Sequence, residues 1–167
     1  DVGGHINVPV RTFPTRSGTT AIAAGEPVMV AVSGGINAPV VIQPYVVALT
    51  DGKPAKAGAS GIDYFVGVSA NAGSHTSSAD GTIDVYLDIP GVVWGLKAKT
   101  PTTFDTQAEV DNQTFYRISF DLTGSDYRAD VLADSAVYGL IIVGGEPSTY
   151  TVYVMALEAT TWRSMAG

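Results

Sequence analysis

Two histidines are the first side chains to consider for chemistry, because histidine is the usual general base near neutral pH. His5 lies among glycines and prolines, and His75 lies in the polar stretch Asn71 to Asp80, so we expect both in mobile loops. A general base must be held within hydrogen-bond reach of the proton that it removes. Three serines flank His75, but the sequence has no Gly-x-Ser-x-Gly elbow. The pattern therefore predicts no catalytic triad, and we expect the protein not to be an enzyme.

Four aspartates form the one carboxylate cluster that resembles a metal site: Asp121, Asp126, Asp130 and Asp134. Hard cations prefer several oxygen ligands from one loop, but this spacing matches no calcium loop and lacks the closing glutamate. The pattern favours a solvated acidic face. The absence of cysteine from the sequence excludes thiolate ligands and disulfides. The glycine pairs at 34–35 and 144–145 lack the lysine of a phosphate-binding loop, so we expect no metal and no cofactor.

Charge and hydropathy argue against two classes of partner. The chain carries a net charge of −7, which opposes binding to nucleic-acid phosphates. No apolar run approaches the roughly 20 residues that a membrane helix needs. We therefore expect neither nucleic acid nor a membrane as a partner. The aromatic residues are scattered among apolar segments, which favours core packing over a stacking platform.

The elements that must position these groups are mainly strands. Of the 167 residues, 46% are apolar and 15% are charged, which favours one all-β domain over disorder or a helical bundle. Thr106 and Glu109 form a capping box that predicts one short helix, which Asn112 can close near Asp111. Apolar or alternating patterns predict these strands: Val28 to Val32, Val40 to Leu49, Tyr64 to Ala70, Phe115 to Leu122, Tyr127 to Ala133, Val137 to Val143 and Tyr150 to Glu158. The last two are expected to form a hairpin.

The stretch Thr82 to Lys99 carries the clearest pattern. Two alternating segments meet at Pro90-Gly91, a signal for a type II turn, and the pattern predicts an antiparallel hairpin. Its register pairs four sets of residues: Ile89 with Val92, Leu87 with Trp94, Val85 with Leu96, and Asp84 with Lys97. Trp94 is then expected in the core, and Tyr86 is expected to cover Gly95.

Residues 1–20 have the features of an extended N-terminal arm, because two prolines and three glycines interrupt them. A short alternation runs through this segment from His5 to Val8. No partner strand lies within the segment, so we expect Gly4 to Arg16 to be loose until it adds to the sheet edge of another protein. A frayed terminus is the alternative.

The order of these pieces resembles the head decoration, or cement, proteins of tailed double-stranded DNA bacteriophages. After a flexible arm come AAGEPVMV, YFVGVSAN and GTIDVYLDIPGVVWGLKAKT, then a short capped helix and FDLTG. The resemblance covers about residues 20–124. It implies a mostly β fold, a single compact antiparallel β-barrel or tulip-like domain with one short helix. The arm would span 1–20, the decoration domain 21–158 and a C-terminal tail 159–167.

The resemblance also implies a function. The protein would bind the outside of a capsid, usually as a homotrimer, and bridge neighbouring major capsid subunits of a virion assembled in the host cytoplasm. By position, seven residues of the arm would join the shell: His5, Ile6, Asn7, Val8, Val10, Arg11 and Arg16. No catalytic motif is carried over.

Two other classes stay open. A non-catalytic β-sandwich module for carbohydrate or a host surface needs an exposed aromatic platform or an acidic calcium site. A hydrolase needs an ordered His75. The exposure of Trp162, Tyr127 and His75 separates these classes from the cement protein.

Overall fold

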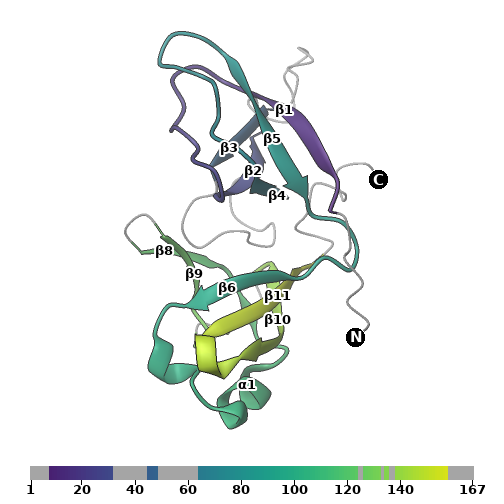
Figure 1. Ribbon diagram of the computed structural model, residues 1–167, viewed down its shortest axis with the longest axis vertical. Coiled ribbons are helices and arrows are strands. Elements are labelled where there is room, and N and C mark those ends of the chain that lie inside the picture. Colours follow the sequence, from purple (N-terminus) through teal and green to yellow (C-terminus); the bar gives the residue numbers. More distant parts are fainter. Residues whose placement is uncertain are drawn as a thin grey trace. The chain divides into compact units, whose positions relative to one another are not determined.

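The computed structural model describes residues 8–31, 45–48, 64–123, 126–132, 134–135 and 138–157. Strands dominate these residues, with a single α-helix among them, so the expected mostly β fold is confirmed. The strands form two sheets (Figure 1). The chain forms two compact units, residues 1–48 with 66–92 and residues 49–65 with 93–167, so that it passes between them three times. Within the described ranges, no helix has the length and apolarity to cross a membrane.

The sheet of the first unit has five strands: β1 (Val10–Thr15), β2 (Pro27–Ala31), β3 (Tyr45–Ala48), β4 (Tyr64–Ser69) and β5 (Gly81–Leu87). The first two residues of β4, Tyr64 and Phe65, belong to the second unit. They form one sheet in the order β1-β5-β4-β2-β3. Its edge strands β1 and β3 come close to each other, so the sheet is nearly closed into a barrel. Ile83, Val85 and Leu87 are buried while Thr82 and Tyr86 are exposed, which confirms the predicted alternation of β5.

Part of the expected arm belongs to this sheet. The sequence predicts that Gly4 to Arg16 are loose, because no partner strand lies within that segment, but Val10–Thr15 pair with β5 along their whole length. The prediction of a loose segment is therefore wrong for β1. Its partner strand lies far along the chain, so the pairing cannot be read from the segment itself. Pro14 is tolerated because β1 is an edge strand, where an N–H can be absent.

The second unit carries a curled six-stranded sheet in the order β7-β10-β11-β6-β9-β8. Its strands are β6 (Trp94–Ala98), β7 (Arg117–Ile118), β8 (Phe120–Thr123), β9 (Asp126–Ala129), β10 (Leu140–Glu146) and β11 (Thr151–Ala156). The β6 and β9 strands run parallel, which the antiparallel barrel implied by the resemblance does not include. A parallel pair needs a long crossover, and the connection here includes a helix at Gln107–Gln113.

The predicted hairpin over Thr82 to Lys99 is wrong, although its turn is correct. Val92 N donates to Ile89 O (3.1 Å), and Gly91 has a φ of +88°, as a type II turn requires. However, β5 pairs with β1 and β4, whereas β6 pairs with β11 and β9 in the other sheet. Tight hairpins favour the primed turns, whose twist matches that of paired strands. The strands on either side of Pro90-Gly91 accordingly separate, and the predicted register does not form.

The helix α1 (Gln107–Gln113) follows a short 3-10 turn, η1 (Pro101–Thr103), and begins at the predicted capping box. Glu109 N donates to Thr106 Oγ1 (3.3 Å), and Thr106 N donates to Glu109 Oε2 (3.0 Å). The Thr106 hydroxyl also donates to that carboxylate, and these bonds lower the pKa of Glu109. The helix ends at Gln113, two residues beyond the predicted end near Asp111.

The second predicted hairpin is confirmed. The strands β10 and β11 are antiparallel and are joined by the 3-10 turn η2 (Pro147–Thr149). Val143 is an extra residue in β10, because Ile142 pairs with Val154 and Gly144 pairs with the adjacent residue of β11, Tyr153. This β-bulge increases the local twist of the strand.

Other predicted strands are shorter than expected or fall partly outside the described residues. The stretch Phe115 to Leu122 divides into β7 and β8, and Phe115 lies before them with a φ of +73°. Residues 32, 40–44, 49, 133, 137 and 158, at the ends of predicted strands, lie outside the described ranges, as does the predicted tail 159–167.

Aromatic rings form much of the core of the second unit. Phe65 and Phe120 are fully buried, with ring centroids 5.5 Å apart. The Trp94 ring meets Phe65 edge-on at 6.0 Å, but Trp94 is half-buried rather than fully in the core. Phe104 is also fully buried and lies against the backbone of Gly145 on β10, where a Cβ would collide with its ring. Glycine at 145 is therefore what lets this ring enter the core.

Candidate binding surface

The residues expected to bind a capsid lie partly on β1. Three of the seven, His5, Ile6 and Asn7, lie outside the described residues. Val8 and Arg16 are half-buried and flank the strand, whereas Val10 and Arg11 are its first two residues. Because neighbours on a strand point to opposite faces, Val10 and Arg11 do not share a surface.

Val10 belongs to an apolar row on the outer face of the first sheet, which we name the outer row: Val10, Tyr86 and Val68. Val10 lies opposite Tyr86 of β5, and Tyr86 lies opposite Val68 of β4. Directly opposed residues share a face, and the sequence neighbours of Tyr86 are buried, so the row points outward. Val10 is 51% exposed and Tyr86 is 43% exposed. Three adjacent strands thus contribute to one continuous apolar strip.

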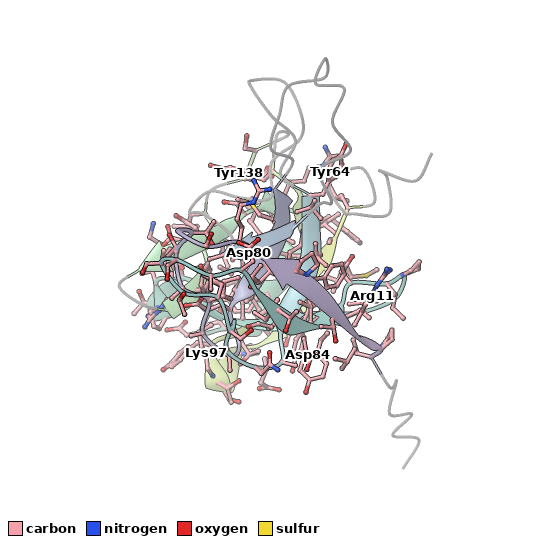
Figure 2. All side chains as sticks on the ribbon, turned by 90° about the horizontal axis from the view of Figure 1, so that it is seen from above. Arg11, Tyr64, Asp80, Asp84, Lys97 and Tyr138 are labelled. Carbon is pink, nitrogen blue, oxygen red and sulfur yellow. The ribbon has the colours of Figure 1, made fainter. Side chains whose placement is uncertain are left out.

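Arg11 lies on the other side of β1. It is opposite Val85, a buried residue of β5, and its guanidinium lies 5.5 Å from the centroid of the Phe13 ring. This cation–π contact orients the exposed side chain near the beginning of the strand (Figure 2).

Asp84 fixes β1 beside the outer row. Thr12 Oγ1 donates to Asp84 Oδ1 (2.6 Å), and Asn71 Nδ2 donates to Asp84 Oδ2 (3.0 Å). Asp84 N in turn donates to Asn71 Oδ1 (3.0 Å). The predicted partner of Asp84, Lys97, instead donates to Thr149 O (2.7 Å) in the second unit. The two side chains, labelled in Figure 2, therefore have separate partners.

His75 does not lie in a mobile loop, contrary to the expectation from sequence. Backbone hydrogen bonds anchor the stretch around it: Gly73 N donates to Ile22 O (2.9 Å), and Ser74 N donates to Thr82 O (3.0 Å). Gly81 adds to this because a Cβ there would collide with the backbone of Ser74 and His75. The polar side chains of the stretch suggest flexibility, but its anchors are backbone groups, which sequence patterns do not reveal.

An ordered His75 still has no catalytic partners among the described residues. Its Nε2 lies 3.3 Å from Thr19 Oγ1, and its Nδ1 is buried without a hydrogen-bond partner. The Ser74 hydroxyl accepts from Thr82 N (2.9 Å) and donates to Thr82 O (3.2 Å), so it is committed to the backbone. Asp80 accepts from Ser17 N (2.7 Å), which lowers the pKa of its carboxyl. These bonds do not make a Ser–His–Asp relay.

Two of the four clustered aspartates, Asp121 and Asp130, form ion pairs with one lysine, so they are not simply solvated. Lys99 Nζ lies 2.7 Å from Asp121 Oδ2 and 2.9 Å from Asp130 Oδ2. The hydrogen bond with Asp121, and to a smaller extent the one with Asp130, raises the pKa of the Lys99 ammonium. Asp134 Oδ1 accepts from Arg117 N (2.9 Å). In the part of the chain that the structure describes, no three histidine, cysteine or acidic side chains form a metal-binding group.

Tyr127 and Trp162 are the other two side chains whose exposure separates the functional classes. Tyr127 is half-buried, and its ring meets Phe120 edge-on at 6.3 Å, so it belongs to the core edge. Trp162 lies outside the described residues. Comparisons of the chain with protein-family models, with curated proteins and with solved structures find no significant match.

Proposed function

We propose that this chain is a structural virion protein that binds the outside of a bacteriophage capsid and stabilises it by bridging neighbouring major capsid subunits. The observation that carries the proposal is the outer row, which exposes apolar surface at the start of β1. The segment expected to join the shell leads directly into this surface. The order of strand and turn motifs, which resembles that of phage decoration proteins, supports the same function.

The arm would act as a continuation of β1. Leu87 N, at the end of β5, donates to Pro9 O (2.9 Å), so the segment that precedes β1 still pairs with β5 at the residue before Val10. Side chains alternate along an extended chain, so Ile6 and Val8 would share the face of Val10 if the strand continued. Bound to an exposed sheet edge of the capsid, this face would add apolar contacts to those of the outer row.

We further propose that the protein acts as a homotrimer on the outer capsid surface, in virions assembled in the host cytoplasm. Ordering an arm costs about 1–2 kcal/mol of backbone entropy per residue, so each arm alone binds weakly. Three linked arms bind far more strongly than one, because the second and third contacts become intramolecular.

The proposal is tested by co-sedimentation with capsids of the phage that encodes the chain. A truncation must stop before β1, since removing Val10–Thr15 would remove a strand of the first sheet. Deleting residues 1–7 should leave the thermal unfolding transition unchanged and abolish capsid binding. Val10→Asp, which places a charge in the outer row, should weaken binding by at least about tenfold.

The matched control is Leu132→Asp, which places the same charge on an exposed apolar position of the second unit. It should bind capsids as the wild-type protein does. If the protein without residues 1–7 still decorates capsids at wild-type occupancy, the arm is not the binding element and the proposal fails.

A further inference from the structure

The outer face of the second sheet carries an aromatic side chain between two glycines. Tyr153 of β11 lies opposite Gly95 of β6 and Gly144 of β10. Its neighbours Val152 and Val154 are fully buried, so Tyr153 points outward, and it is 40% exposed. Neither flanking strand has a side chain in this row that could cover the ring.

The two glycines leave different surroundings on the two sides of the ring. Tyr153 Cδ1 and Cε1 lie 3.9 and 3.8 Å from the position of a Cβ on Gly95, so the ring leans over β6. A Cβ on Gly144 would meet nothing within 4 Å, so the space on the side of β10 is open. The bulged residue Val143 is exposed beside it. The ring is thus supported on one side and accessible on the other.

A polar row crosses the same three strands next to the tyrosine. Thr151 lies opposite Lys97 of β6 and Glu146 of β10, and it is two residues, or about 7 Å, from Tyr153. Lys97 Nζ donates to Thr149 O (2.7 Å) and to Thr151 Oγ1 (3.3 Å). An ammonium has three donors, so one is left for a ligand. One oxygen of Glu146 accepts from a serine hydroxyl (2.6 Å), which leaves the other as an acceptor.

We propose that this face binds a neutral pyranose oligosaccharide. One sugar ring stacks on Tyr153, and hydroxyls of the adjoining sugar bond to Lys97 and Glu146. A pyranose presents an apolar C–H face and a rim of hydroxyls, which matches an electron-rich aromatic face beside donors and acceptors held in place. This function does not depend on the proposed binding to a capsid.

The charge and polarity of the face favour a sugar over other flat ligands. The net charge of −7 on the chain repels the phosphates of a nucleic acid. An apolar peptide would bury the charges of Lys97 and Glu146 and leave part of their hydrogen-bonding capacity unfilled, at an energetic cost. A hydroxyl-rich neutral ligand both donates to the carboxylate and accepts from the ammonium. The surface is open and shallow, so affinity in the millimolar range is expected.

Nuclear magnetic resonance of the full chain tests the proposal, with maltohexaose, cellohexaose and chitohexaose as probes. At least one of the three should shift the backbone amides of Gly95, Gly144 and Tyr153. Tyr153→Ala should weaken that binding by about tenfold or more, because the stacking surface is lost. Tyr153→Phe retains the ring and should bind nearly as well as the wild-type protein.

Lys97→Met provides a second variant that leaves the ring in place, and it should weaken binding several-fold through the lost hydroxyl contact. The matched control is Leu132→Ala, which truncates an exposed apolar side chain elsewhere in the same unit and should leave binding unchanged. The proposal is overturned if none of the three sugars shifts these amides, if the shifts lie on another face, or if Tyr153→Ala binds as the wild-type protein does.

Discussion

Gly145→Ala tests whether the core of the second unit depends on contact between a ring and a bare backbone. The added methyl would collide with the Phe104 ring, which is fully buried, and would lie 2.7 Å from Thr151 O. Overpacking of this kind typically costs about 1–3 kcal/mol. Replacing glycine by alanine also stabilises by about 0.4–1 kcal/mol through the unfolded chain. We expect a net loss of about 1–2 kcal/mol, because the rigid neighbours cannot move aside.

Two further variants make the reasoning specific. Gly95→Ala is the matched control, since its methyl would make ordinary contacts of 3.5 Å or more in the same sheet, and it should cost nearly nothing. Phe104→Leu removes the ring atoms that the new methyl meets. In a double-mutant cycle, Gly145→Ala should therefore be less destabilising in the Phe104→Leu background, with a coupling of about 0.5–2 kcal/mol.

Urea denaturation of the four proteins of the cycle and of Gly95→Ala, followed by tryptophan fluorescence, measures these free energies. The account is refuted if Gly145→Ala and Gly95→Ala destabilise equally, because position 145 would then have no special contact. Strict additivity of Gly145→Ala and Phe104→Leu would refute the role of the ring.

Three predictions concern local interactions. The ion pairs of Lys99 with Asp121 and Asp130 raise its pKa above the usual 10.5. Their stabilisation is complete below pH 10.5 and is lost as the pH rises through the raised pKa, so the difference in unfolding free energy between wild type and Lys99→Met should shrink in strong alkali. A constant difference would contradict this. The bond from Ser17 lowers the pKa of Asp80 below 3.8. Its contribution is present above pH 3.8 and is lost as the pH falls through the lowered pKa, so Asp80→Asn should lose less stability in acid than wild type, measured by thermal unfolding; equal losses would count against the bond. Thr106→Ala removes the N-cap and should cost about 1 kcal/mol in urea denaturation. An unchanged midpoint would mean that the cap contributes nothing.

Local features of the fold could be predicted from the sequence because a few neighbouring residues determine them. The capping box at Thr106 and the turn at Pro90-Gly91 are both present, and the hairpin of β10 and β11 forms as predicted. Pairing between distant segments could not be predicted. The alternation of β5 shows that one face is buried, but it does not distinguish β1 from β6 as the neighbouring strand.

In the candidate sites, too, single residues could be predicted from the sequence, whereas contacts between distant strands could not. Val10 was identified from its position in the arm that the resemblance implies, but its contact with Tyr86 depends on the pairing of β1 with β5. Lys99 was missed as the partner of the aspartates, because the parallel pairing of β6 with β9 brings it to them. The platform at Tyr153 had a weak signal, since glycines on both flanking strands are visible in the sequence but their register is not.

The central claim is that residues 1–10 attach the protein to a capsid, and electron cryomicroscopy of capsids decorated with the chain tests it most directly. The account predicts density for three copies on the outer surface, with each arm running from β1 along a sheet edge of a major capsid subunit and Val10 at the contact. Density in which the arm points into solvent while another surface touches the capsid would contradict the account, as would capsids that remain undecorated at saturating protein.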